Sequence, residues 1–206
     1  AITTGIDNTI IGSLAGDALT DADYNVAIGK VALSSDTKGN KSVAIGNGAL
    51  AVQNFTSSTD SHNTAVGFDA GGAVTTGTSN TLIGSGAGDS ITTGAGHVLI
   101  GEATGTSITT NNHNTFVGRN VGTSTTGGFN TFIGCSNGNT GATGHYVTSG
   151  TKNTIIGAYS GNQNSVDIRT SSNNIVLSDG DGVPKLYINS NNFTNVSNDI
   201  SESSRF

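Results

Sequence analysis

A five-residue pattern that ends in glycine recurs along most of the chain, and it limits the chain to a repeat architecture. The pattern is usually Asn, then Thr or Val, then a residue of variable size, then Ile or Val, then Gly. The spacing of the pattern glycines is nearly constant, apart from longer intervals between Gly46 and Gly67 and between Gly134 and Gly157. The nine glycines are Gly12, Gly29, Gly46, Gly67, Gly84, Gly101, Gly118, Gly134 and Gly157, and a degenerate tenth copy ends at Ser178.

Each position of the pattern favours an extended strand. The residue before the glycine and the residue two places earlier are β-branched in every copy, and such side chains suit strands. These two side chains share one face of the strand, while the variable residue shares the other face with Asn. Both faces are partly apolar, so we expect both to be covered. We also expect the residue before the glycine, such as Ile83, to lie in the core.

A second stretch begins three residues after each glycine, with Ala followed by Gly or Leu, as in Ala15-Gly16 and Ala32-Leu33. Each coil is thus expected to hold two short strands and two turns. Stacked coils separated by ~4.8 Å would rise roughly 45 Å over nine coils. The sequence predicts an all-β, elongated parallel β-solenoid (β-roll) of about nine to ten coils with a period of about 17 residues. Residues 1–178 form this repeat array, and 179–206 form a C-terminal cap or transition segment.

Such a coil is too thin to cover the second apolar face of its strand. That face is expected to pack on other copies of the same chain about a shared axis, with the variable middle residues filling the axis layer by layer.

The repeats carry a family resemblance. Asn25-Val-Ala-Ile-Gly29 and Ser42-Val-Ala-Ile-Gly46 are similar to the left-handed parallel β-roll of trimeric autotransporter adhesin heads. The longer period and the Thr-Thr-Gly connections, as at Thr75–Gly77, look more like a related repeat of bacteriophage tail fibres. The run Ser172–Gly182 also resembles the segment that ends many such fibres. The resemblance implies a homotrimer, although this sequence has no coiled-coil stalk, membrane anchor or chaperone domain.

Charge and composition narrow the partners. The formal net charge is −6 and no Lys/Arg cluster is present, so we expect no nucleic-acid partner. No apolar run approaches the ~20 residues that span a bilayer, so we expect no membrane insertion. The single Cys135 is expected to be a packed or inert thiol. The absence of an initiator Met favours part of a longer protein or a mature piece of one.

Candidate catalytic and metal-binding groups are sparse. Asp179 and Asp181 flank a glycine and favour a solvated tight turn, with a cation site as the alternative. The histidines are expected to be polar ladder members or exposed turn residues, with ions on a trimer axis as the alternative. The Asn column is expected to hydrogen-bond along the stack through its amides. We therefore predict no enzyme, no catalytic residue, no cofactor and no metal.

The predicted function is structural and adhesive. Length variation in solenoids falls in loops, so the expansions at Val52–Ser61 and Thr140–Lys152 are the candidate receptor-facing surface. Phe55, His145 and Tyr146 within them are suited to stacking on sugars, with ordinary loop packing as the alternative. The resemblance implies the distal part of a phage tail fibre, in the virion, that attaches to a host cell-surface glycan or an outer-membrane receptor. A bacterial cell-surface adhesin head, located extracellularly, is the alternative.

Two functions of other classes remain open. Thr75, Thr92, Thr109 and Thr125 nearly form one threonine per coil, as an ice-binding solenoid requires. A polysaccharide-cleaving tailspike is the second, although a glycosidase needs two carboxylates on opposite sides of one bond and the close Asp pairs lie in turns.

Overall fold

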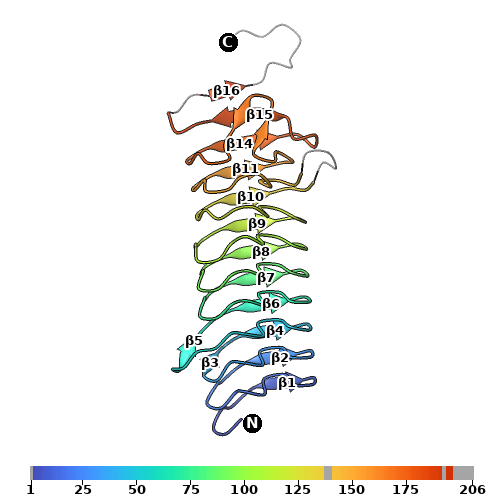
Figure 1. The fold of residues 1–206 in the computed structure, drawn as a ribbon, viewed down its shortest axis with the longest axis vertical. Coiled ribbons are helices and arrows are strands. Elements are labelled where there is room, and N and C mark those ends of the chain that lie inside the picture. Colours follow the sequence, from blue (N-terminus) through green and yellow to red (C-terminus); the bar gives the residue numbers. More distant parts are fainter. Residues whose placement is uncertain (1, 137–140, 192–193, 197–206) are drawn as a thin grey trace.

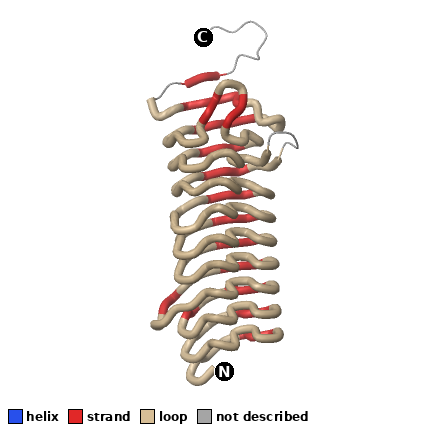
Figure 2. Tube along the Cα trace, in the orientation of Figure 1, coloured by secondary structure: helices blue, strands red, loops and turns tan. Residues whose placement is uncertain are grey.

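The computed structural model describes residues 2–136, 141–191 and 194–196, and within these residues the chain forms sixteen short strands and no helix. The coils stack into an elongated body with its first and last strands at opposite ends (Figure 1). The predicted all-β class is confirmed. Most of each coil is turn and loop, and the strands line up along one side of the stack (Figure 2).

One twelve-stranded sheet runs along the stack, and ten of its strands are parallel, with one strand from each coil. Neighbouring coils pair without slippage: Thr81 lies on Val98, Leu82 on Leu99 and Ile83 on Ile100. The predicted parallel solenoid is confirmed, with about ten coils and a period of about 17 residues. The ten strands are β1 (Thr9–Ile11), β2 (Val26–Ile28), β4 (Val43–Ile45), β6 (Thr64–Val66), β7 (Thr81–Ile83), β8 (Val98–Ile100), β9 (Thr115–Val117), β10 (Thr131–Ile133), β11 (Thr154–Ile156) and β14 (Ile175–Ser178).

The remaining strands mark the irregular coils and the C-terminal end. After β14 the direction reverses, because β15 (Pro184–Ile188) pairs antiparallel with β14, and β16 (Thr194–Val196) pairs antiparallel with β15. At the first expansion, β3 (Gly39–Asn40) pairs in parallel with β5 (Thr59–Asp60). Beyond β11, β12 (Asn162–Gln163) and β13 (Val166–Asp167) form a small antiparallel hairpin.

The second stretch of each coil is not a strand, which corrects the expectation of two strands per coil. Those residues form turns, and several adopt left-handed backbone conformations, such as Leu33 at φ 51° and Leu50 at φ 49°. A coil this short has to change direction sharply to close on itself. Left-handed residues supply these corners while their side chains stay inside: Leu33 and Leu50 are fully buried.

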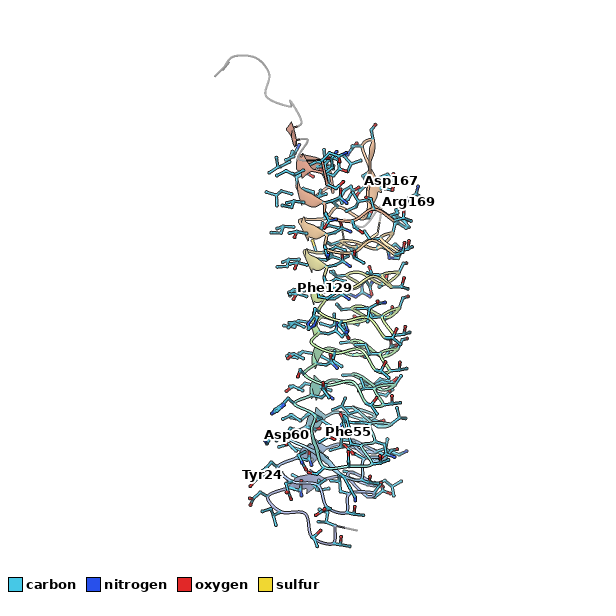
Figure 3. All side chains as sticks on the ribbon, turned by 90° about the vertical axis from the view of Figure 1, so that its left-hand side faces the viewer. Tyr24, Phe55, Asp60, Phe129, Asp167 and Arg169 are labelled. Atoms are coloured by element: carbon cyan, nitrogen blue, oxygen red, sulfur yellow. The ribbon has the colours of Figure 1, made fainter. Side chains whose placement is uncertain are left out.

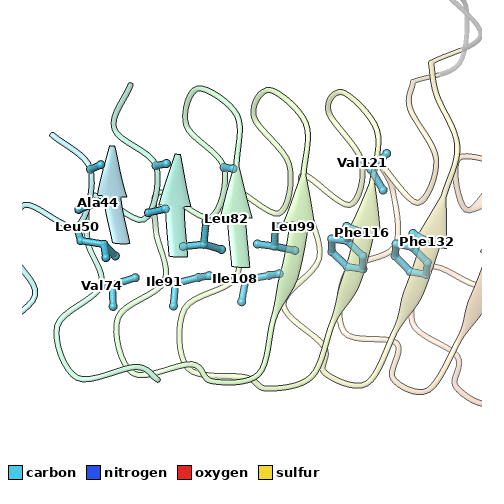
Figure 4. Close-up of a cluster of buried hydrophobic side chains, with 14 of the residues drawn as sticks. Ala44, Leu50, Val74, Leu82, Ile91, Leu99, Ile108, Phe116, Val121 and Phe132 are labelled. Atoms are coloured by element: carbon cyan, nitrogen blue, oxygen red, sulfur yellow. The ribbon is translucent and has the colours of Figure 1, made fainter. Parts of the chain in front are cut away.

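The core is a column of side chains inside the coils (Figure 4). The variable middle residue of every strand from β2 onward in the parallel set is fully buried, and Phe116 stacks on Phe132 with ring centroids 4.7 Å apart. The middle residues form one column of the core, and the left-handed residues such as Leu33 and Leu50 form a second. A third column, which includes Ile91, Ile108 and Ile168, completes the core. The middle residue therefore fills its own coil. The expectation that it fills an axis between chains is wrong.

Core volume is balanced between two positions in several coils; in the fourth coil Ala65 and Gly71 are both small, and Leu82 of the next coil fills the space beside Gly71. Where the strand residue is Ala27 or Ala44, the left-handed residue six places later is Leu33 or Leu50. Where the strand residue is larger, that later residue is glycine, as in the pairs Leu82 with Gly88, Leu99 with Gly105 and Phe116 with Gly122. A Cβ on Gly122 would lie 2.4 Å from the Phe116 ring, so only one of the two positions can be large.

Candidate functional site

The outward face of the main sheet is an apolar strip without charge. Alternation places the middle residue inward, so the residues on either side of it face outward. Ile83 is 38% exposed and Ile11 is 59% exposed, which shows that the expected core role of the residue before each glycine is wrong. The strip consists of Thr9, Ile11, Val26, Ile28, Val43, Ile45, Thr64, Val66, Thr81, Ile83, Val98, Ile100, Thr115, Val117, Thr131, Ile133, Thr154, Ile156, Ile175 and Leu177.

The strip is long and chemically uniform. Ten strands separated by ~4.8 Å extend it over roughly 45 Å. A sheet face that stays in water usually carries polar and charged side chains, whereas none of the strip positions is charged. An uncharged apolar surface of this length is typical of an interaction surface.

A row of turn residues borders the strip. These residues immediately precede the Asn column and adopt left-handed conformations, and Figure 3 shows two of them, Tyr24 and Phe129, beside the strands. Tyr24 is 52% and Phe129 is 55% exposed. His113 lies against Phe129 with ring centroids 5.1 Å apart. In the same row, Lys41 forms an ion pair of 2.5 Å with Asp60, and this hydrogen bond lowers the pKa of the Asp60 carboxyl.

The Asn column links each coil to the next through the backbone. Asn63 Oδ1 accepts a hydrogen bond from the Asn80 N–H at 3.0 Å, and Asn63 Nδ2 donates to the Gly77 carbonyl at 2.7 Å. The same pair of bonds recurs along the stack, so the amides bond mainly to backbone rather than to one another, contrary to our expectation. The column is structural, because its members from Asn25 onward are buried.

His97 occupies an Asn position and reproduces the Asn contacts. Its Nδ1 accepts from the Asn114 N–H at 3.2 Å, and its Nε2 lies 2.7 Å from the Asn111 carbonyl, which assigns the proton to Nε2. Burial lowers the pKa of this imidazole. His97 is thus a polar ladder member, whereas His62 and His113 are exposed turn residues.

A threonine ladder runs along a face that is distinct from the strip. The hydroxyls of Thr75, Thr92 and Thr126 each donate to the backbone carbonyl of the ladder residue in the following coil, at 3.1–3.4 Å. The ladder is longer than expected and passes through Thr126 rather than the buried Thr125. Its members are Thr3, Thr20, Thr37, Asn54, Thr75, Thr92, Thr109, Thr126, Thr148 and Arg169. Most of these hydroxyls therefore join coils to one another.

Of the candidate receptor-facing residues, Phe55 lies inside. It is 7% exposed, and its N–H donates to Asp36 Oδ1 at 3.1 Å. Asp36 is itself buried and also accepts from Gly39 and Gln53. Phe55 packs against Gly39, where an added Cβ would lie 2.8 Å from the phenyl ring. Ordinary loop packing therefore describes this residue, because no face of its ring is available at the surface.

Tyr146, in contrast, is 44% exposed. The ring of His145 meets it edge-on, with centroids 4.7 Å apart and planes 76° apart. His145 Nδ1 lies 2.6 Å from Thr123 Oγ1, which holds the imidazole in place. Thr140, the first residue of this predicted loop segment, lies outside the described residues.

The next coil places a charged pair near Tyr146 that the sequence did not indicate. The Tyr146 N–H donates to the Ser160 carbonyl, and the Thr148 N–H donates to the Arg169 carbonyl, so the two segments are adjacent. Arg169 Nε and Nη2 contact the two carboxylate oxygens of Asp167 at 3.0 and 2.7 Å. These hydrogen bonds lower the pKa of the Asp167 carboxyl. The residues lie two apart on β13 and the segment after it, a spacing too common to single out in a sequence.

Other groups considered in the sequence have structural surroundings. Asp179 accepts from the N–H groups of Val183 and Asp181 and lies 3.2 Å from Lys185 Nζ, as expected for a tight turn. Cys135 is exposed, so of the two expectations for it, a packed or an inert thiol, the packed one is wrong. Among the described residues, no three His, Cys, Asp or Glu side chains gather in a metal-binding arrangement, and no helix is long and apolar enough to cross a membrane.

Comparison with protein families, with curated proteins and with solved structures found no match for this chain. The functional proposal therefore rests on the fold, on the apolar strip and on the face that carries the threonine ladder.

Proposed function

We propose that this chain is a structural fibre protein, a homotrimeric rod that presents a receptor-binding surface, and that it forms the distal part of a phage tail fibre in the virion. What supports the proposal most is the uncharged apolar strip, which extends along the whole stack of coils. A partner that covers such a strip has to be equally long and equally regular. A second copy of the same chain has both properties.

A threefold arrangement covers the strip of every chain at once. In a closed ring about an axis parallel to the stack, each strip faces the axis and all coils keep the same height. The β-branched side chains of the strip are stiff at χ1, which limits the entropy lost when they interdigitate. The number three rests on the resemblance of the repeats to trimeric adhesin heads and tail fibres. Covering the strip leaves the threonine-ladder face and the hairpin outside, where a receptor can reach them.

The receptor is proposed to be a host cell-surface glycan or an outer-membrane component. Tyr146 and the β12–β13 hairpin lie on an outer face and interrupt the regular coils, as binding loops on solenoids do. A bacterial cell-surface adhesin head has the same physical requirements and remains the alternative. An ice-binding function on the threonine ladder is less favoured, because the hydroxyls of Thr75, Thr92 and Thr126 donate to backbone carbonyls.

Cell retention tests the proposal. Labelled purified protein is incubated with a panel of bacterial strains and followed by flow cytometry. We expect saturable retention on particular strains that unlabelled protein competes away. The Ile83→Lys variant, which disrupts the strip, should lose retention through loss of avidity, whereas Thr76→Lys on a connecting turn should retain it. Thermal hysteresis, or release of reducing sugar from capsule, together with no retention on any strain, would replace this proposal by the ice-binding or the tailspike function.

A further inference from the structure

The face that carries the threonine ladder changes character in its last two coils. On this face a buried column consists of Val74, Ile91, Ile108, Val147 and Ile168, and the residues directly before and after each member are half-buried or exposed. In earlier coils the residue before is small or aliphatic: Ala18, Ser35, Val52, Ala73, Ser90, Ser107 and Ser124. In the last two coils the same position holds Tyr146 and then Asp167, and the ladder itself ends on Arg169.

Backbone hydrogen bonds confirm this register. The Thr126 N–H donates to the Thr148 carbonyl at 2.8 Å, and the Thr148 N–H donates to the Arg169 carbonyl at 2.7 Å. Thr148 and Arg169 therefore occupy equivalent positions in neighbouring coils. Asp167, two residues before Arg169, ends the β12–β13 hairpin, which begins two residues after Ser160, the backbone partner of Tyr146. Figure 3 shows Asp167 and Arg169 on the side of the stack away from the sheet.

The aromatic ring at this place is held before any ligand arrives. His145 meets the Tyr146 ring edge-on, and Thr123 holds His145 at 2.6 Å. The Tyr146 backbone is also fixed, because its N–H donates to Ser160 at 2.8 Å. A tyrosine that is already ordered loses little conformational entropy when a ligand stacks on it.

The neighbouring pair offers both hydrogen-bond donors and acceptors. Arg169 holds Asp167 through its Nε, its Nη2 and its backbone N–H, at 3.0, 2.7 and 3.1 Å. The two side chains are 50% and 48% exposed, so their outer edges face solvent. Oδ1 of Asp167 accepts from both Nε and the backbone N–H, whereas Oδ2 accepts only from Nη2 and keeps a further acceptor site. Nη1 of the guanidinium is not part of these contacts.

We propose that Tyr146, Asp167 and Arg169 form a subsite for an uncharged pyranose. This inference rests on the proposed function, since it names the chemistry of the receptor. The apolar C–H face of the sugar ring stacks on Tyr146, while adjacent hydroxyls donate to Asp167 and accept from Arg169. An acidic sugar is disfavoured, because Asp167 already compensates the charge of Arg169 and the chain carries a formal net charge of −6.

Saturation-transfer NMR on the purified full chain tests the subsite, with the methyl α-pyranosides of glucose, galactose and mannose as probes and a methyl glucuronide as the acidic probe. A single subsite should bind at least one neutral glycoside with a millimolar Kd. Tyr146→Ala and Asp167→Asn should each weaken that binding about tenfold, which corresponds to the loss of one good contact. Tyr146→Phe, which keeps the ring, should bind within about twofold of the wild type.

Matched controls use the same side chains elsewhere. Tyr24→Ala removes another exposed tyrosine, and Glu102→Gln breaks another exposed carboxylate–arginine pair; both should leave glycoside binding unchanged. Circular dichroism establishes that every variant is folded. Saturation transfer to no neutral glycoside, preference for the glucuronide, or wild-type binding by Tyr146→Ala would overturn the inference.

The outcomes also separate this subsite from the proposed function. If the wild-type chain is trimeric and Tyr146→Ala is still retained on cells, the subsite assignment fails and the fibre function stands. If the chain is monomeric and is not retained on cells, but Tyr146-dependent glycoside binding persists, the fibre function fails and the subsite stands.

Discussion

Exchanging volume between Leu82 and Gly71 tests the packing of the core. Leu82 is fully buried, and its Cδ1 occupies the space beside Gly71 in the preceding coil, where an added Cβ would lie 2.6 Å from it. Leu82→Ala removes this filling and should lower the free energy of unfolding by about 2–5 kcal/mol, through lost transfer energy and the cavity left behind. Gly71→Leu alone should also destabilise the protein, because the new side chain meets Leu82.

The double variant should be more stable than the sum of the two changes predicts. In the double variant the fourth coil would carry Ala65 together with a leucine at position 71. This is the same Ala–Leu pair that Ala44 and Leu50 form in the third coil. The left-handed backbone of Gly71, at φ 60°, strains a leucine there, although Leu50 adopts φ 49° in the preceding coil. The strain is present in both the single and the double variant, so it cancels in their coupling. We expect the coupling to recover at least about 1 kcal/mol, within the range seen for residues in contact.

Urea unfolding of the wild type, the two single variants and the double variant measures this coupling energy. All four proteins are compared at one protein concentration, because the free energy of unfolding of an associating chain depends on concentration. The outward Ile83→Ala change serves as a control and should cost less than Leu82→Ala at the level of the single chain. Additive effects in the double variant would refute the volume exchange. A Leu82→Ala variant as stable as the wild type would mean that the two strand faces are wrongly assigned.

Two further predictions concern the coil-to-coil contacts. Because burial lowers the pKa of His97 from 6.5, the unfolded chain takes up a proton first as pH falls, so the stability contributed by neutral His97 is complete above about pH 6.5 and decreases below it. The coulombic effect of His113 adds to the lowering of the His97 pKa. His97→Asn, which restores the common ladder residue, should reduce the difference between the urea midpoints at pH 7.5 and pH 5, and an unchanged difference would contradict the lowered pKa of His97. Gly84→Ala should lower stability by at least about 2 kcal/mol, because φ is +134° and a Cβ would lie 2.5 Å from the Gly101 carbonyl, whereas Gly180→Ala, with nothing within 4 Å, should leave the melting temperature unchanged.

Much of the fold could be predicted because the repeat carries its own register. The pattern glycines and the β-branched neighbours of the middle residue are enough to predict a parallel stack and its period. The inner face was assigned wrongly, because both strand faces are apolar and the residue before each glycine is always Ile or Val, whereas the middle residue varies from Ala to Phe. The informative signal was the compensation between positions, in which Ala27 is paired with Leu33 and Leu82 with Gly88. Only residues that share an enclosed space need to exchange volume in this way.

The candidate site was less predictable. Loop expansion correctly placed Tyr146 in an irregular coil, but the same argument included Phe55, which is buried beside Asp36. A sequence does not distinguish a loop that folds back on the stack from one that leaves it. Asp167 and Arg169 were missed for a related reason: their position beside Tyr146 depends on the hydrogen bond between Thr148 and Arg169, which joins residues 21 positions apart.

The mass of the chain in solution tests most directly whether the apolar strip joins three copies. Native mass spectrometry or light scattering should give three times the chain mass of 20.5 kDa for the wild type. The Ile83→Lys variant should give the single-chain mass of 20.5 kDa because it introduces a charge into the strip, and Thr76→Lys on the connecting turn should keep the mass of the trimer. A wild-type protein that is folded and stable at 20.5 kDa would contradict the account, because the strip would then be exposed to water.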